Sequence, residues 1–305
     1  MDKLRKIIPA VLCAIFWSLT FIAVKKLVVP LSPVEAAYLS ADQLTIGMLT
    51  IAYLSLWAAS PYAVSPKINK NELLLILSGS MLYASIELIG FAQQSISSLR
   101  AAVLSVGPAI ILPPIAFEVI RNRKISFNQT LGSILLIAGM FVVLTHGEFS
   151  FEHTIIGEYP AFVSGFCAAA FISLQMFTDC EKGRLTSIRK SVFYALIIFG
   201  IVALFKGHGE TGTKGFAYMS EEYFLMSIFF LGIVTLVASP ALWLQTIKFD
   251  KSNTPYFIIS IIPTLAVLIG FGMSKEHITR DIVVGAVWIM AGIMLAVWGK
   301  TNNKQ

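Results

Sequence analysis

The chain has 305 residues, of which 56% are hydrophobic and only 13% are charged, and its formal net charge is +6. Soluble domains carry about 25% charged residues, so this composition leaves too little polar surface for a soluble fold. The basic excess lies in short segments between apolar blocks, where it signals membrane topology and not nucleic-acid binding.

Ten apolar blocks follow one another along the chain, and each approaches the roughly 20 residues that a helix needs to cross a bilayer. We predict spans at residues 7–24, 34–58, 73–94, 101–120, 127–144, 155–177, 192–205, 224–245, 256–273 and 282–298. The first block lacks a cleavage site of small residues, so we interpret it as a span and not as a signal peptide. The expected fold class is an all-α integral membrane bundle of ten transmembrane helices.

Lys and Arg are unequally distributed between the two sides of such a bundle. Counting alternate connecting segments places 16 of the 23 basic residues on the side of the termini and 7 on the other. Cytoplasmic loops are enriched in Lys and Arg, so both termini are expected in the cytoplasm. We therefore expect a multi-pass protein of the plasma (inner) membrane that contacts lipid, binds no nucleic acid, and is a monomer or a homodimer.

The two halves of the chain are weakly similar around their fourth and fifth spans. Aligning Pro108 with Pro263 places Ser105 over Ser260, and a shift of two residues then places Gly132 over Gly285 and Gly139 over Gly292. Five spans per half is an odd number, so the second copy enters the membrane in the opposite sense. We predict a first five-helix repeat at 1–147, an extracytoplasmic linker at 148–157 and a second repeat at 158–305, around a central cavity. Close helix packing explains the glycines equally well.

Several short motifs resemble a known family. They are Phe16-Trp17-Ser18-Leu19-Thr20-Phe21 followed by Lys25, and Pro263, the turn Lys275-Glu276-His277-Ile278-Thr279, Gly285 and Gly292 near the end. These segments resemble the ten-helix, EamA-type members of the drug/metabolite transporter superfamily. Two positions depart from that pattern: Arg123 replaces the turn glutamate in the first half, and Asp42-Gln43 stands where relatives often carry arginine.

The resemblance implies an inverted-repeat bundle whose cavity is lined by helices one to four and six to nine, with helices five and ten as supports. Relatives move amino acids, drugs, sugar phosphates or nucleotide sugars. Family membership therefore implies transport more firmly than it implies a cargo.

Two acidic residues fall inside predicted spans, where ionisable groups usually serve a function. Asp42 and Glu87 are expected about 12 Å and 10 Å from the outer ends of their spans, given a rise of about 1.5 Å per residue. Tyr83, Glu87 and Gln94 recur at helical spacing and form one polar stripe. We expect Asp42 or Glu87 to bind a cationic group or to exchange protons, and hydrogen bonding between helices is the alternative.

Aromatic residues and prolines give weaker signals in the same spans. Trp17, Trp243, Tyr83 and Tyr256 are candidates for stacking on a cationic or aromatic solute, although packing is the commoner role. Pro108 and Pro263 interrupt backbone hydrogen bonding at matching positions, and each is a candidate hinge or a static kink.

The chemistry expected from the sequence is transport and not catalysis. The four histidines, His146, His153, His208 and His277, lack metal-ligand spacing, and no phosphate-binding glycine loop occurs, so we expect no enzyme activity, cofactor or bound metal. We predict a secondary transporter, an exporter or exchanger, that moves a small molecule such as an amino acid or related amine by alternating access. Protons are a candidate coupling ion. A nucleotide-, phosphate- or sugar-containing metabolite or a drug is the alternative cargo, and a channel or an intramembrane lipid-modifying enzyme is a remote alternative.

Overall fold

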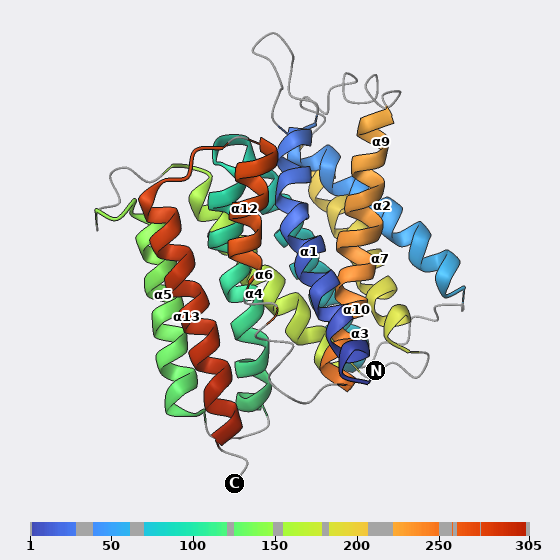
Figure 1. The fold of residues 1–305 in the computed structure, drawn as a ribbon. Helices are drawn as coiled ribbons and strands as arrows, with labels where there is room; N and C mark the ends of the chain where they lie inside the picture. The colour runs from blue at the N-terminus through green and yellow to red at the C-terminus, as the bar shows by residue number, and fades with distance from the viewer. Residues whose placement is uncertain are drawn as a thin grey trace.

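The computed structural model describes residues 2–28, 39–61, 70–120, 125–148, 155–178, 183–206, 222–249, 258, 261–274 and 276–302. Within these ranges the chain forms ten helical rods, which confirms the predicted all-α membrane class (Figure 1). Six stretches of these rods are long and apolar enough to cross a membrane: Ile8–Val28, Lys70–Ser95, Phe127–Leu144, Glu158–Phe177, Arg184–Phe205 and Met226–Thr246.

The first five rods are α1 (Asp2–Val28), α2 (Ala41–Ala59), α3 (Lys70–Ser95), α4 (Ser98–Ile120) and α5 (Phe127–Leu144). The second five are α6 (Glu158–Phe177), α7 (Arg184–Lys206), a continuous rod of α9 (Glu222–Phe229), η2 (Phe230–Ala238) and α10 (Ser239–Phe249), then α12 (Ile262–Ser274) and α13 (Arg280–Asn302). The start of α1 and the end of α13 lie at one end of the bundle, which we call the terminal end (Figure 1). The other end is called the opposite end.

The second rod begins later than its hydropathy suggests, so the predicted start at residue 34 is wrong. Ser40 has an extended backbone, its hydroxyl accepts the backbone N–H of Gln43, and the Gln43 side chain accepts the backbone N–H of Ser40. This reciprocal capping box satisfies backbone N–H groups that otherwise have no partner at the start of a helix, so α2 begins at Ala41. Asp42 consequently lies in the first turn of α2 and not about two turns inside the span.

The eighth rod contains a stretch of π-helix, η2, immediately before Pro240. Proline has no backbone N–H and its ring collides with the carbonyl four residues earlier, so a wider turn avoids both penalties. The carbonyl of Val234 accepts the backbone N–H of Ser239 and, at 2.7 Å, also the Ser239 hydroxyl. The wider turn lies in the middle of the rod, where Thr235 and Leu236 face the centre of the bundle.

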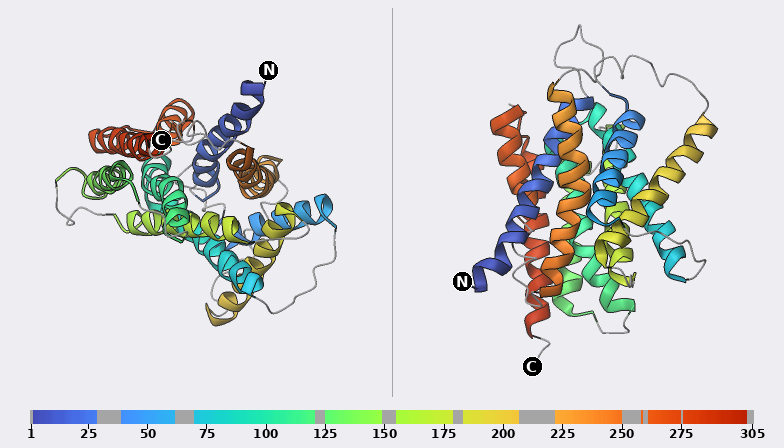
Figure 2. Two further views of the ribbon diagram at one scale, coloured as in Figure 1. Left: turned by 90° about the horizontal axis from the view of Figure 1, so that it is seen from below. Right: turned by 90° about the vertical axis from the view of Figure 1, so that its right-hand side faces the viewer.

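Helices of the two halves pack against each other reciprocally. α1 packs on η2, α10 and α12, whereas α6 packs on α3 and α4, so the first rod of each half contacts the third and fourth rods of the other. α2 pairs with α7, and α5 pairs with α13. Viewed along the bundle, the α5–α13 pair lies at one side and the α2–α7 pair at the other (Figure 2). This exchange of contacts is what two related halves predict, and the exact repeat boundaries remain a prediction.

Glycines bring α5 and α13 into backbone contact. A Cβ on Gly139 would lie 2.8 Å from the carbonyl oxygen of Gly285, and a Cβ on Gly292 would lie 2.5 Å from that of Gly132. Small residues of this kind let membrane helices approach closely enough for extensive van der Waals contact. The four glycines that the sequence alignment paired between the halves are therefore packing residues of the α5–α13 seam.

Candidate functional site

A central cavity of about 150 Å³ lies between the two halves. Its walls come from α1, α2, α3 and α4 in the first half and from α6, η2 and α10 in the second. α5 and α13 contribute no lining residue among those that the structure describes, and they pack behind α4. This arrangement agrees with the role of supporting helices that the family resemblance implies for the fifth and tenth rods, but α7 and α12, which it implies as lining helices, also contribute no lining residue in the described part of the chain.

The polar groups of the cavity wall are hydroxyls. Thr20 of α1 and Thr235 of η2 share a hydrogen bond of 2.8 Å between their hydroxyl oxygens. Ser164 of α6 donates to the backbone carbonyl of Ser85 of α3 at 2.9 Å. Each pair joins the first rod of one half to the third rod of the other. The wall therefore offers matched hydrogen-bonding groups on two opposite faces.

The rest of the wall is apolar and aromatic. It includes Trp17, Phe21 and Phe171, together with aliphatic side chains, and no charged side chain belongs to the part of the wall that the structure describes. Trp17 packs against Trp243 of α10, with 6.4 Å between ring centroids and a tilt of 58°. Trp243 is only 3% exposed. Of the two tryptophans predicted to stack on a solute, Trp17 therefore borders the cavity and Trp243 packs behind Trp17.

The predicted acidic residues lie outside this wall. Glu87 of α3 accepts a hydrogen bond of 2.8 Å from the hydroxyl of Thr45, which is fully buried on α2. Glu87 therefore belongs to the α2–α3 contact, and Asp42 lies one turn before Thr45 in the first turn of α2. Their predicted roles in substrate binding or proton exchange are not tested by this placement and remain predictions.

The residues of the polar stripe on α3, Tyr83, Glu87 and Gln94, lie in different environments. The ring of Tyr83 packs edge-on against Phe199 of α7 at a centroid distance of 6.2 Å, and Gln94 is exposed near the end of α3. Neither residue borders the cavity. The structure therefore does not gather Tyr83, Glu87 and Gln94 around one solute, because the central cavity faces a different side of α3, formed by Leu82, Ser85, Ile86 and Ile89.

The two candidate hinges occupy unlike positions. Pro108 is buried within α4, next to the lining residue Ala109. Pro263 lies in the first turn of α12, where a missing backbone N–H costs little. Tyr256, the remaining predicted contact, falls outside the residues that the structure describes.

Two family-like motifs close the opposite end of the bundle. The ammonium of Lys25 on α1 donates to the carbonyls of Gln93 and Ile96 at 2.7 and 2.8 Å, where α3 ends. Glu276, before α13, accepts the backbone N–H groups of Ser98 and Leu99 at 3.1 and 3.2 Å, where α4 begins. A cation at a helix C-terminus and an anion at an N-terminus both match the helix dipole. Lys25 thus ties α1 to the end of α3 within the first half, and Glu276 ties the second half to the start of α4.

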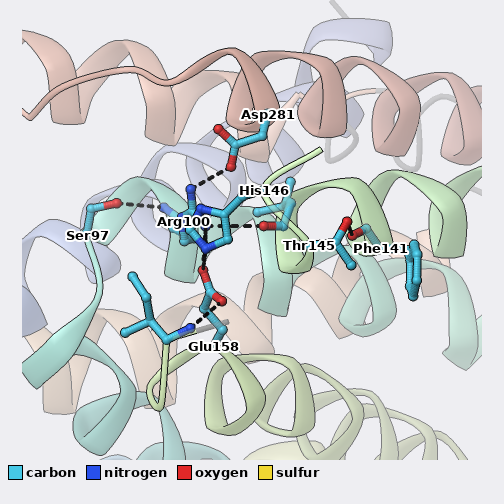
Figure 3. Close-up of polar contacts among 9 residues, drawn as sticks. Ser97, Arg100, Phe141, Thr145, His146, Glu158 and Asp281 are labelled. Carbon is cyan, nitrogen blue, oxygen red and sulfur yellow. Dashed lines mark hydrogen bonds and ion pairs between the residues drawn. The ribbon is translucent and has the colours of Figure 1, made fainter. Parts of the chain in front are cut away.

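A cluster of charged residues at the same end was missed by the sequence reasoning. The guanidinium of Arg100, in the first turn of α4, forms ion pairs with Glu158 of α6 and, at 2.5 Å, with Asp281 of α13 (Figure 3). Its Nη1 also lies 3.0 and 2.8 Å from the two ring nitrogens of His146, which follows α5. These residues occupy the ends of predicted spans, where hydropathy gives no reason to connect them.

Comparison with known proteins finds a family similarity in the second half of the chain. Residues 156–298 match the model of the EamA-like transporter family. A WAT1-related protein of Arabidopsis thaliana is 30% identical over 125 residues, which cover 40% of this chain but only 31% of the plant protein. An uncharacterized transporter of Clostridium kluyveri is 23% identical over 232 residues, covering 75% of this chain and 73% of that one.

The overall fold also has a solved counterpart. One crystal structure of a protein matches over 99% of both chains with a TM-score of 0.61 at 13% identity, a likeness that shows the fold alone. The sequence matches support the resemblance found in the motifs. The chain is a multi-pass membrane protein whose second half, residues 156–298, is similar to the EamA-like transporter family.

Proposed function

We propose that the chain is a secondary carrier that moves a small, largely apolar solute across the plasma (inner) membrane by alternating access. The observation that carries the proposal is the central cavity, which is bounded by helices of both halves and lined by hydroxyls and aromatic rings. A site at the interface between related halves can open to either side when the halves exchange conformations. The positive-inside bias supports cytoplasmic termini.

The lining favours an uncharged solute with an aromatic or aliphatic ring and one or two hydrogen-bonding groups. An engineered apolar cavity of comparable volume in another protein takes up benzene, so about 150 Å³ suffices for one ring. Apolar walls with a few well-placed polar groups are typical of small-molecule sites. Phosphate-containing cargo is disfavoured because the described wall offers no cation to pair with it.

An amino acid or related amine, the cargo expected from the sequence, would need partners for its charged groups. Burying a charge without such a partner costs several kcal/mol. Asp42 and Glu87 are the acidic candidates from the sequence; Glu87 lies in the α2–α3 contact, and neither acid belongs to the wall. We therefore place the uncharged solute first and keep the amine, carried by export or exchange, as the alternative.

A thermal-shift screen of the purified protein tests the proposed cargo class. The library contains uncharged ring compounds, amino acids, amines and phosphorylated metabolites, since a bound solute raises the melting temperature by mass action. We expect stabilisation by uncharged ring compounds, followed by saturable uptake of the same compounds into proteoliposomes. Stabilisation by amino acids or amines alone would overturn the assignment, and unsaturable flux would indicate a channel.

A cavity-filling variant ties the result to the site. Ala168→Phe places a ring into the lining contributed by α6, and we expect it to abolish both the thermal shift and the uptake. Ala58→Phe makes the same change on an exposed position near the end of α2 and serves as the matched control. Equal uptake by the two variants would exclude the central cavity as the transport site.

A further inference from the structure

We propose that His146 is the proton-binding site that controls access to the central cavity from the opposite end of the bundle. The inference rests on the proposed carrier function for its purpose, but its evidence is the charged cluster of Arg100, His146, Glu158 and Asp281. These four residues come from α4, the turn after α5, α6 and α13, so the cluster joins helices of both halves (Figure 3).

The first step is the charge of the cluster. Two carboxylates face one guanidinium, so the sum is −1 when the imidazole is neutral and zero when the imidazole carries a proton. Glu158 is 0% exposed, and the Arg100 and Asp281 side chains are 7% and 9% exposed. The imidazole is 25% exposed and is the member most accessible to solvent protons. Imidazole is also the side chain that ordinarily changes charge between pH 5 and about pH 8.

The second step is the state of the imidazole in this structure. His146 Nε2 lies 3.1 Å from Glu158 Oε1, an arrangement in which Nε2–H donates to the carboxylate. Nη1 of Arg100, which can only donate, lies 3.0 Å from Nδ1 and 2.8 Å from Nε2, so it faces both ring nitrogens. A neutral ring with its proton on Nε2 keeps a lone pair on Nδ1 that accepts from Arg100, whereas a protonated ring has no lone pair left.

Proton uptake at Nδ1 changes these contacts in a defined way. An imidazolium ring has two N–H donors and no acceptor, so the contact with Arg100 becomes a repulsion between two cations. The imidazolium keeps its donor to Glu158 Oε1, the same oxygen that Arg100 uses. His146 therefore competes with Arg100 for Glu158 once it is protonated, while Arg100 retains Asp281 and the carbonyl of Val143.

The cluster is placed to pass this change on to the cavity. Arg100 lies in the first turn of α4, whose residue Ser105 lines the cavity, and Glu158 opens α6, whose residue Ser164 lines it as well. Weakening the Arg100–Glu158 pair releases the same ends of two wall helices from each other. Among the residues that the structure describes, further acidic groups at this end are Glu276, which caps α4, and Glu148, two residues beyond His146.

The backbone of His146 has a conformation that suits glycine better than histidine. Its φ of 53° lies in the left-handed region, and the N–H groups of His146 and Gly147 return to the carbonyls of Val143 and Val142. This is the Schellman ending of a helix, in which glycine is the usual residue at the position of His146. A residue with a side chain is strained in this conformation. Glycine would suit the fold of this turn better than histidine does.

That strain supplies a test variant that should not disturb folding. His146→Gly relieves the left-handed strain and removes the imidazole, and His146→Gln keeps a neutral hydrogen-bonding side chain. His277→Gln is the matched control, since His277 is an exposed histidine at the same end and outside the cluster. All variants are made in a background with Cys13, Cys167 and Cys180 replaced and with the reporter Ser105→Cys in the cavity wall.

The measurement is the rate at which a membrane-impermeant maleimide labels the reporter in sealed vesicles of either orientation. Rates at about pH 8 and about pH 5.5 are normalised to the unfolded chain, which removes the pH dependence of the thiol itself. In the parent, which retains His146, and in the His277→Gln variant, the rate of labelling from the opposite end is expected to rise several-fold on acidification. With His146→Gly or His146→Gln, it is expected to stay flat.

The outcomes separate this inference from the carrier proposal. An unchanged pH response in both His146 variants would overturn the proton site, whatever the uptake assays give. A flat response in the parent would also overturn it. A response that depends on His146 in a protein that takes up no solute would support the proton site and refute the carrier function.

Discussion

Gly292 of α13 lies so close to Gly132 of α5 that a Cβ on Gly292 would fall 2.5 Å from the carbonyl oxygen of Gly132. A second contact between glycines on the α5–α13 seam joins Gly139 and Gly285. Because Gly132 aligns with Gly285 and Gly139 with Gly292 in the sequence, exchanging the halves converts one contact into the other. These four glycines therefore belong both to the sequence similarity between the halves and to the close packing of α5 against α13.

A side chain at this seam should separate the two supporting helices. We expect Gly132→Leu to lower the free energy of unfolding by about 1–3 kcal/mol or more, because the new atoms meet backbone and not a flexible side chain. The melting temperature in detergent measures the effect. Gly200→Ala is the control, since nothing lies within 4 Å of its added Cβ. A drop of equal size in both variants would refute the packing role.

The carboxylate of Glu276 should stabilise the start of α4. It accepts two backbone N–H groups and, at 2.9 Å, the hydroxyl of Ser98. Glu276→Gln retains one acceptor but loses the charge at the helix N-terminus, so we expect a loss of about 1–2 kcal/mol in thermal or denaturant unfolding. His277→Gln changes the adjacent exposed residue and should leave the midpoint unchanged. An unaltered midpoint for Glu276→Gln would argue against the cap.

Substitution of Trp243 should lower the stability of the fold, whereas substitution of Trp17 should weaken solute binding. Trp243 is 3% exposed and does not border the cavity, so Trp243→Ala is expected to cost about 3–5 kcal/mol of folding free energy. Trp17 borders the cavity, and Trp17→Ala should weaken the binding of any solute that raises the melting temperature of the parent. Thermal shift with and without that solute distinguishes the two effects. Identical behaviour of the two variants would contradict the assignment.

A buried ion pair ties α3 to α7 at the terminal end. The ammonium of Lys190 lies 2.7 Å from a carboxylate oxygen of Glu72, and the hydroxyl of Tyr194 donates to the other oxygen. Lys190→Met leaves the carboxylate without its cation, and we expect a loss of about 3–5 kcal/mol. The double variant Glu72→Leu with Lys190→Met should recover most of that loss.

Denaturant or thermal unfolding in detergent measures this coupling. Lys70→Met, an exposed change at the start of α3, is the control and should have little effect. A double variant as unstable as Lys190→Met alone would show that the pair is not the cause of the loss.

Some features of the site were visible in the sequence and others were not. The aromatic first span pointed to Trp17, which borders the cavity, and the turn glutamate pointed to Glu276, which caps α4. The importance of Arg100, Glu158 and Asp281 had no local signal, because each is an isolated charge at the end of an apolar block. Hydropathy also misplaced the start of the second rod, since it does not register the capping geometry of Ser40.

The sequence by itself determined the membrane class and the ten rods, because a bilayer admits only backbone that is internally hydrogen-bonded and apolar over about 20 residues. Such helices are apolar on every side, so their composition leaves open how each rod is rotated and which neighbour it faces. Only the tertiary structure decided that hydroxyls and not carboxylates line the cavity, and that residues 100, 146, 158 and 281 meet. Those outcomes depend on packing between rods distant in the chain.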